Sequence, residues 1–204
     1  MKQNTILSER FCLFTFIFVF LALSSPAYSQ QFGIRLHVPF SKFSGEGLDN
    51  TTYKPIINYN CINFQYYSDE SSFTYFSEFG FGAIGTKQEY NGKTYDAELF
   101  SLYTGLFLKY NILEPEQTPY IYSGINLNLN FANELNLATK TEHGIEVTNL
   151  DHRIFLPLLS FGAGYTFLNG VFCIDLRDNI GITSVDPANT VRCNEFSVGI
   201  VYKK

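Results

Sequence analysis

The chain has 204 residues, of which 17% are aromatic and 16% are charged, and its formal net charge is -5. This length predicts one domain, or at most two small ones. The acidic balance argues against a nucleic-acid partner, which requires clustered lysine and arginine side chains.

Residues 1–29 have the organisation of a secretory signal peptide. Lys2 and Arg10 form a short basic region, residues 11–23 are apolar, and Ala27–Ser29 has small residues at the first and third positions of a cleavage site. The alternative, a retained membrane anchor, needs roughly 20 apolar residues, and this run is shorter. We therefore expect a leader at 1–29 and a single domain at 30–204.

Three cysteines follow the leader, Cys61, Cys173 and Cys193. An odd number without Cys-x-x-Cys spacing predicts neither a zinc site nor a disulfide framework. Two interpretations stay open: one disulfide between Cys173 and Cys193, as an exported protein allows, or three small, partly buried thiols.

The rest of the chain contains strand-like runs separated by clusters of Gly, Asn, Asp, Ser or Pro, and no long segment with a helical period. The most regular run is 121–131, where apolar residues alternate with asparagines. A change of phase in the second run predicts a bulge near Cys61, and Asn91–Gly92 predicts a two-residue hairpin turn. Eight strands are predicted, at Phe32–Phe40, Ile56–Tyr66, Phe73–Ala83, Phe100–Tyr110, Ile121–Phe131, Arg153–Phe167, Phe172–Gly181 and Glu195–Tyr202.

Glycine indicates which face of these strands is crowded. Nine glycines fall on the polar face, and only Gly85 falls on the apolar one. Glycine offers no side chain to lipid, but inside a narrow barrel it makes room for a neighbouring tyrosine or arginine. The polar face is therefore predicted to be the interior.

The connections between runs differ in length at the two ends of the sheet. Those after the second, fourth and sixth runs are shorter than most of the others. Short turns at one end and long loops at the other are typical of an outer-membrane barrel. By parity both ends of the domain lie on the periplasmic side, and the longest connection, Ala132–His152, is expected to be an extracellular loop.

Alternation alone does not distinguish a barrel with an apolar outside from one with an apolar inside, so a soluble lipocalin-like carrier of a small apolar ligand is the alternative. The membrane interpretation is favoured by runs of about 9 to 11 residues and by ionisable residues on the glycine-bearing face. It is also favoured by the Phe and Tyr residues near the run ends. The chain has no Trp, so it lacks the Gly-x-Trp start usual in a small calyx.

The second half of the domain resembles the PorT-like small outer-membrane β-barrel proteins of Gram-negative bacteria. The similar segments are Phe100–Tyr110, Thr118–Gly124, Phe161–Phe167, Asp175–Thr183 and Phe196–Tyr202. The resemblance implies an all-β fold, an eight-stranded antiparallel up-and-down transmembrane barrel in the outer membrane, and no common catalytic activity.

The polar face carries several ionisable residues whose charges must pair if they are buried. Because the first, seventh and eighth strands are neighbours once the barrel closes, we expect a structural network inside the barrel. Its members are predicted to be Arg35, Glu78, Asp175, Arg177 and Glu195. A lumen filled in this way would not be a channel.

The sequence thus predicts a non-catalytic barrel with a structural or binding role, in contact with outer-membrane lipid and with periplasmic or cell-surface proteins. No cofactor, metal or nucleic acid is expected. An outer-membrane lipid-modifying enzyme is the alternative, with Asp151 and His152 as its candidate residues. Pro39 and Pro157 lie within predicted strands, where we expect bulges or frayed ends.

Overall fold

The computed structural model describes residues 31–44, 53–57, 61–68, 71–90, 93–113, 117–131, 135–141, 144–150, 153–185 and 191–204. The predicted leader at 1–29 lies outside these ranges. Within them, no helix is long and apolar enough to cross a membrane. The strands are β1 (Gln31–Ser44), β2 (Tyr53–Ile57), β3 (Cys61–Tyr67), β4 (Phe73–Tyr90), β5 (Lys93–Asn111), β6 (Pro119–Asn130), β7 (Leu135–Thr141), β8 (Gly144–Leu150), β9 (Phe155–Phe167), β10 (Phe172–Gly181) and β11 (Arg192–Lys203).

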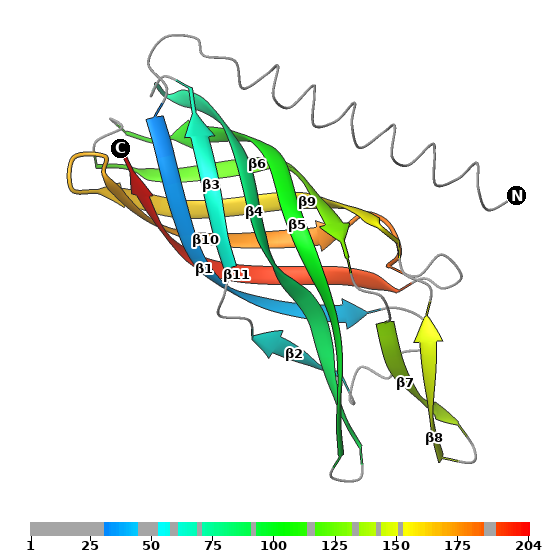
Figure 1. Cartoon of the computed structure of the whole chain (residues 1–204). Helices are drawn as coiled ribbons and strands as arrows, with labels where there is room; N and C mark the ends of the chain where they lie inside the picture. The colour runs from blue at the N-terminus through cyan, green and yellow to red at the C-terminus, as the bar shows by residue number, and fades with distance from the viewer. Residues whose placement is uncertain are drawn as a thin grey trace, which may run out of the picture. The chain divides into compact units, whose positions relative to one another are not determined.

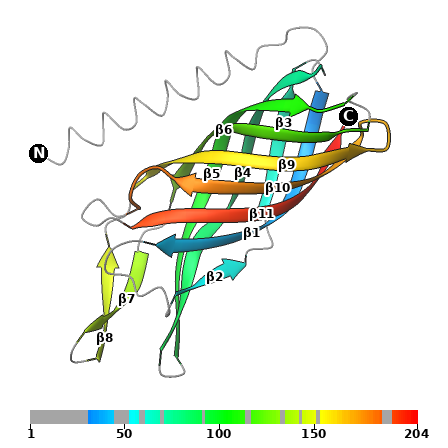
Figure 2. The same ribbon diagram turned by 180° about the vertical axis from the view of Figure 1, so that it is seen from behind.

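Nine of these strands form one antiparallel sheet that closes on itself (Figures 1 and 2). Closure comes from the pairing of β1 with β11, which runs from Gly33 opposite Lys203 to Ser44 opposite Arg192. Because β2 and β3 share one place between β1 and β4, the ring is eight strands around. The chain is therefore an up-and-down β-barrel, as the sequence predicts.

The strands are staggered around the ring. Following directly opposed residues from Phe32 through each neighbouring strand leads back to β1 at Lys42, ten positions further on. This stagger is the shear that a closed sheet requires, and it inclines the strands to the barrel axis. Because the strands are inclined, residues that lie opposite one another on neighbouring strands lie at different depths along the barrel axis. This offset decides which side chains meet inside the barrel.

The predicted second strand is divided into β2 and β3. Phe40 lies opposite Ile57 and His37 opposite Cys61, so the register along β1 shifts by one residue between the two strands. One extra residue against β1 is the signature of a β-bulge, in agreement with the prediction near Cys61. Pro39 faces this interruption, where its missing N–H does not break a ladder bond.

The hairpin of β4 and β5 is longer than the sequence predicts. The two strands stay paired from Phe73 opposite Tyr110 out to Tyr90 opposite Lys93, whereas the predicted strands stop at Ala83 and begin at Phe100. The two-residue connection agrees with the Asn91–Gly92 signal. The extension was missed because it continues past the apolar outer surface, where a strand no longer needs apolar side chains.

The interpretation of Ala132–His152 as one long loop is wrong. This segment contains β7 and β8, which pair with each other from Leu135 opposite Leu150 to Thr141 opposite Gly144. In the sequence, apolar residues alternate here only at Leu135 and Leu137 and at Ile145 and Val147, runs too short to indicate a strand.

The three short connections lie at the end of the barrel where the described chain begins and ends (Figure 1). We call it the short-turn end, and the opposite end the loop end. The β9–β10 turn is the tightest: Leu168, Asn169 and Gly170 have φ angles of 52°, 56° and 86°. Three consecutive residues in the left-handed region reverse the chain between Phe167 and Phe172.

Glycines inside the barrel make room for large side chains of neighbouring strands. A Cβ atom on Gly162 would lie 2.0 Å from Cζ of Tyr122, and one on Gly199 would lie 2.5 Å from Oδ1 of Asp175. A Cβ on Gly164 would meet the hydroxyl of Tyr120 at 2.4 Å. The space over each glycine is thus occupied by a bulky or charged neighbour.

This packing predicts an energetic coupling between Gly162 and Tyr122. Gly162→Ala should lower the free energy of unfolding by about 1–3 kcal/mol, because the added methyl group displaces the tyrosine ring. The same substitution should cost much less in a Tyr122→Ala background, where the space is empty. Urea unfolding of the four proteins in detergent measures the coupling, and equal costs in both backgrounds would contradict the packing argument.

Candidate functional site: the barrel interior

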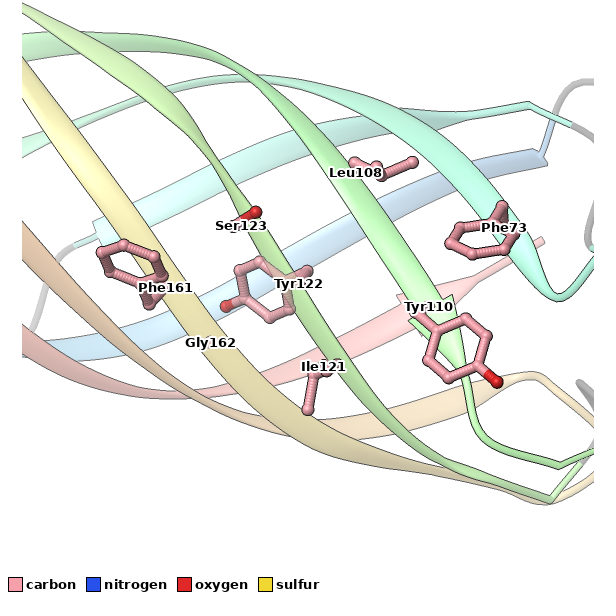
Figure 3. A pocket seen from close by; sticks show the side chains of 8 residues that line it. All are labelled: Phe73, Leu108, Tyr110, Ile121, Tyr122, Ser123, Phe161 and Gly162. Carbon is pink, nitrogen blue, oxygen red and sulfur yellow. The ribbon is translucent and has the colours of Figure 1, made fainter.

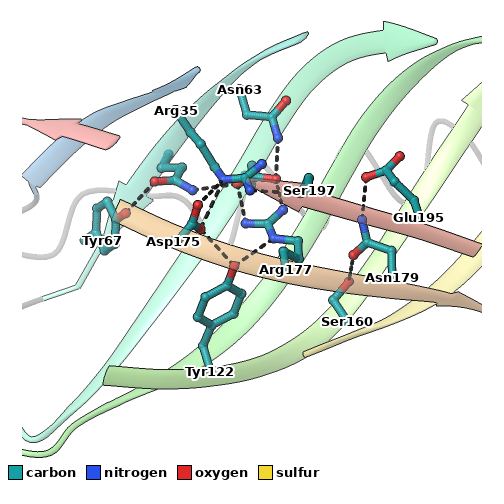
Figure 4. Close-up of polar contacts among 12 residues, drawn as sticks. Arg35, Asn63, Tyr67, Tyr122, Ser160, Asp175, Arg177, Asn179, Glu195 and Ser197 are labelled. Carbon is teal, nitrogen blue, oxygen red and sulfur yellow. Dashed lines mark hydrogen bonds and ion pairs between the residues drawn. The ribbon is translucent and has the colours of Figure 1, made fainter. Parts of the chain in front are cut away.

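A network of charged side chains occupies the middle of the barrel interior (Figure 4). Arg177 on β10 binds Glu78 on β4 through two parallel hydrogen bonds, Nη1 to Oε1 at 2.5 Å and Nη2 to Oε2 at 2.9 Å. Asn63 and Gln65 on β3 each donate a further hydrogen bond of 2.6 Å to the same carboxylate. Glu78 is thus fully satisfied at 1% exposure.

A second ion pair joins this one through a tyrosine. Nε of Arg35 on β1 lies 3.0 and 3.1 Å from the two carboxylate oxygens of Asp175, and its Nη2 donates to Ser197 at 3.0 Å. Tyr122 donates to Oδ2 of Asp175 at 2.9 Å and accepts from Nε of Arg177 at 3.0 Å. Two arginines and two carboxylates therefore form one electrically balanced group.

Glu195, which the sequence places in the same network, lies elsewhere. It accepts a hydrogen bond of 2.8 Å from Nδ2 of Asn179, whose Oδ1 in turn accepts one of 2.6 Å from Ser160 (Figure 4). On β11 it sits opposite Ser41 and Asn179, closer to the loop end than Arg177, which pairs with Ser197. The structure therefore joins four of the five predicted residues and leaves Glu195 apart.

A cluster of aromatic rings lies inside the barrel at the short-turn end. Phe76 stacks on Phe107 with ring centroids 4.6 Å apart, and Tyr122 packs edge-on against both rings. Cations lie over this cluster: Nζ of Lys109 is 4.1 Å from the centroid of the Tyr120 ring, and the Arg177 guanidinium is 4.6 Å from that of Phe107. These contacts hold the positive groups in favourable positions against ring faces.

A cluster of apolar side chains lies inside the barrel at the loop end. The cluster is fully buried and includes a residue of the β10–β11 connection, Val185, held by hydrogen bonds of 2.7 Å from Arg153 N and 2.6 Å to Val191 O. Its members are Phe43, Ile84, Ala97, Leu99, Tyr103, Leu156, Val185, Val191 and Cys193. The sequence missed this cluster because it assigned a polar interior throughout; the extension of β4 and β5 brings Ile84 and Leu99 to inward positions.

The outward face of the barrel has the opposite polarity to the interior. Its side chains are large, apolar and solvent-exposed, as for Ile125 at 59% and Ile200 at 55%. A shallow groove of about 390 Å³ crosses this surface beside Tyr122 (Figure 3). It is lined by Phe73, Leu108, Tyr110, Ile121, Tyr122, Ser123, Phe161 and Gly162.

The remaining candidate residues are the three cysteines and the pair Asp151 and His152. Cys61, Cys173 and Cys193 are all free and buried, so the proposed disulfide is not formed. Asp151 and His152, the candidates of the enzyme alternative, lie outside the described residues. Among the residues that the structure describes, no group of three or more His, Cys, Asp or Glu side chains comes together to hold a metal ion.

No family profile and no curated protein matches the chain. Among solved structures, the chain is similar to the attachment invasion locus protein Ail of Yersinia pestis, with 14% identity over 87% of this chain and 100% of that one, and a TM-score of 0.45. Neisserial surface protein A matches with 15% identity, 86% and 99% coverage and a TM-score of 0.48. OprG of Pseudomonas aeruginosa, an outer membrane protein, matches with 10% identity, 89% and 98% coverage and a TM-score of 0.45.

The network predicts a large cost for removing Glu78. Glu78→Gln should lower the free energy of unfolding by about 3–5 kcal/mol, because it leaves the Arg177 guanidinium buried without its counter-charge. The outward-facing Glu98 gives a matched control, since Glu98→Gln should change stability by about 0.5 kcal/mol or less. Urea midpoints of the folded variants in detergent give both values, and equal effects would refute a buried network.

Proposed function

We propose that the chain is a non-catalytic β-barrel of the outer membrane of a Gram-negative bacterium, with a filled lumen. The observation that carries this proposal is the distribution of polarity. Arginine and carboxylate side chains are buried in the interior, while leucine, isoleucine and phenylalanine side chains cover the outside. In water such an arrangement exposes the apolar surface, whereas in a bilayer it satisfies both faces.

The limits of the apolar surface support a membrane position. Five exposed tyrosines lie on outward positions close to the short-turn end, Tyr66, Tyr75, Tyr110, Tyr165 and Tyr202. Towards the loop end, the outward positions become polar at Lys42, Lys87 and Glu98. An aromatic girdle at one margin and charges at the other are what the two interfaces of a bilayer select.

The filled lumen favours a structural or binding role over transport. Aromatic rings, the charged network and the apolar cluster follow one another along the axis, and an eight-stranded ring leaves no width for a channel beside them. A soluble carrier would need an apolar cavity where the two ion pairs lie. The lipid-modifying enzyme has no described residue to support it.

The loop end is the surface that we assign to binding. The β4–β5 hairpin and the β7–β8 hairpin both extend from this end (Figure 1). The paired strands of both hairpins extend beyond the apolar surface, where a cell-surface partner can contact them. The sequence resemblance to PorT-like barrels is consistent with this role and with periplasmic partners at the opposite end.

Heat-modifiable migration tests the membrane barrel. The mature protein should stay in the carbonate-washed membrane fraction and migrate differently with and without boiling, because a closed hydrogen-bonded sheet resists SDS. Ile125→Arg should reduce the folded fraction strongly, since an arginine in the middle of the lipid-facing surface costs about 2–4 kcal/mol. Glu98→Arg, at the polar margin, should assemble normally; a soluble protein without a heat shift would refute the proposal.

Epitope insertion tests the orientation. A tag between Asn91 and Gly92, at the tip of the β4–β5 connection, should bind antibody on intact cells. A tag after Asn169, in the β9–β10 turn, should bind only after permeabilisation. The opposite pattern would place the loop end in the periplasm and remove it as a cell-surface contact.

A further inference from the structure

The groove on the outward face of β6 exists because Ser123 is small. Its direct neighbours across the sheet are Leu108 on β5 and Phe161 on β9, both large and exposed. The serine therefore forms the floor of the groove, and the two apolar side chains form its walls (Figure 3). The volume of about 390 Å³ lies within the range of small-molecule sites, roughly 300–1,000 Å³.

The groove begins at the exposed tyrosines near the short-turn end. Tyr110, one of these tyrosines, lies directly opposite Ile121 and packs against Phe73 with ring centroids 4.9 Å apart. Its hydroxyl points away from Ser123 (Figure 3). Ser123 is the next outward residue of β6 after Ile121, about 7 Å further along the strand towards the middle of the barrel. Because interfacial tyrosines lie at the level of the lipid headgroups, Ser123 lies just below that level, on the hydrocarbon side.

The hydroxyl of Ser123 is a polar group in an apolar surrounding. Ser123 is exposed on this face, and its hydroxyl forms no hydrogen bond with any residue that the structure describes. None of the side chains that line the groove is charged. Since the hydrocarbon region holds no water, an unpaired polar group there is unfavourable. The site therefore suits a ligand that carries a neutral hydrogen-bond acceptor beside a long apolar portion.

We propose that this groove binds one diacyl glycerophospholipid of the leaflet at the short-turn end. An ester carbonyl of the lipid accepts the hydrogen bond of Ser123, and the attached acyl chain lies between Leu108 and Phe161. The groove is continuous with the apolar outer surface, so an acyl chain enters it without leaving the bilayer. The inference rests on the proposed function, because only a barrel within a bilayer has a leaflet at each end.

The experiment is mass spectrometry of the intact, refolded barrel released from detergent micelles that contain dipalmitoyl phosphatidylethanolamine. One phospholipid per barrel should remain bound after the detergent is removed. Ser123→Phe fills the groove and should abolish this retention. Ser123→Ala removes only the hydroxyl and should weaken the apparent affinity about threefold to tenfold, the effect of one hydrogen bond. Tighter retention of lipid A than of the phospholipid would overturn the choice of ligand.

Ser77 on β4 provides the matched control. It is an outward serine opposite Leu106 on β5 and Tyr66 on β3, and it is not among the residues that line the groove. Ser77→Phe should retain the phospholipid as the wild type does. Equal retention by the wild type and both phenylalanine variants, equal loss in both variants, or no retention by the wild type would each overturn the site.

Heat-modifiable migration of each variant separates this inference from the proposed function. Both phenylalanine variants place an apolar side chain on the lipid-facing surface, so both should fold and show the heat shift of the wild type. A wild-type protein that is soluble without a heat shift refutes the membrane barrel itself. Folded, membrane-bound variants with unchanged lipid retention overturn only the phospholipid site.

Discussion

A ring of eight strands encloses a narrow space, and this limited width constrains the side chains inside the barrel. The four charged side chains Arg35, Glu78, Asp175 and Arg177 are at most 2% exposed, so each must find its counter-charge within the ring. The bidentate contact of Arg177 with Glu78 and the tyrosine bridge to Asp175 meet this requirement. Replacing any one member leaves another buried without compensation, which makes the group interdependent.

The same narrow space explains the pairing of glycines with large residues. Tyr122 reaches the network because Gly162, on the adjacent strand, leaves its ring unobstructed. Gly199 does the same for Asp175 and Arg35. A small residue on one strand thus leaves space for a large side chain from the next strand. The inclination of the strands decides which glycine meets which ring, so register and packing depend on each other.

The pattern of alternation was enough to predict the barrel, the number of strands around it, and which face is polar. The positions of Arg35, Glu78, Asp175 and Arg177 also follow from it, because each lies at an inward position of a regular run. Glu195 shows the limit: alternation gives the face of a residue but not its depth, which depends on the stagger between strands. The strands β7 and β8 were missed for a different reason, since their apolar alternation is too short to indicate a strand. The apolar cluster around Val185 depends on a connection outside any run.

The closing pair of strands has a consequence for the order of assembly. Arg35 and Asp175 are 140 positions apart, and β1 meets β11 only when nearly the whole chain is present. Contacts of such long sequence separation form late and slowly, because the loop they close loses much conformational freedom. Until then β1 and β11 are two unprotected edges able to pair with other chains. The unfinished barrel is therefore most open to pairing with other chains in the interval between synthesis and closure.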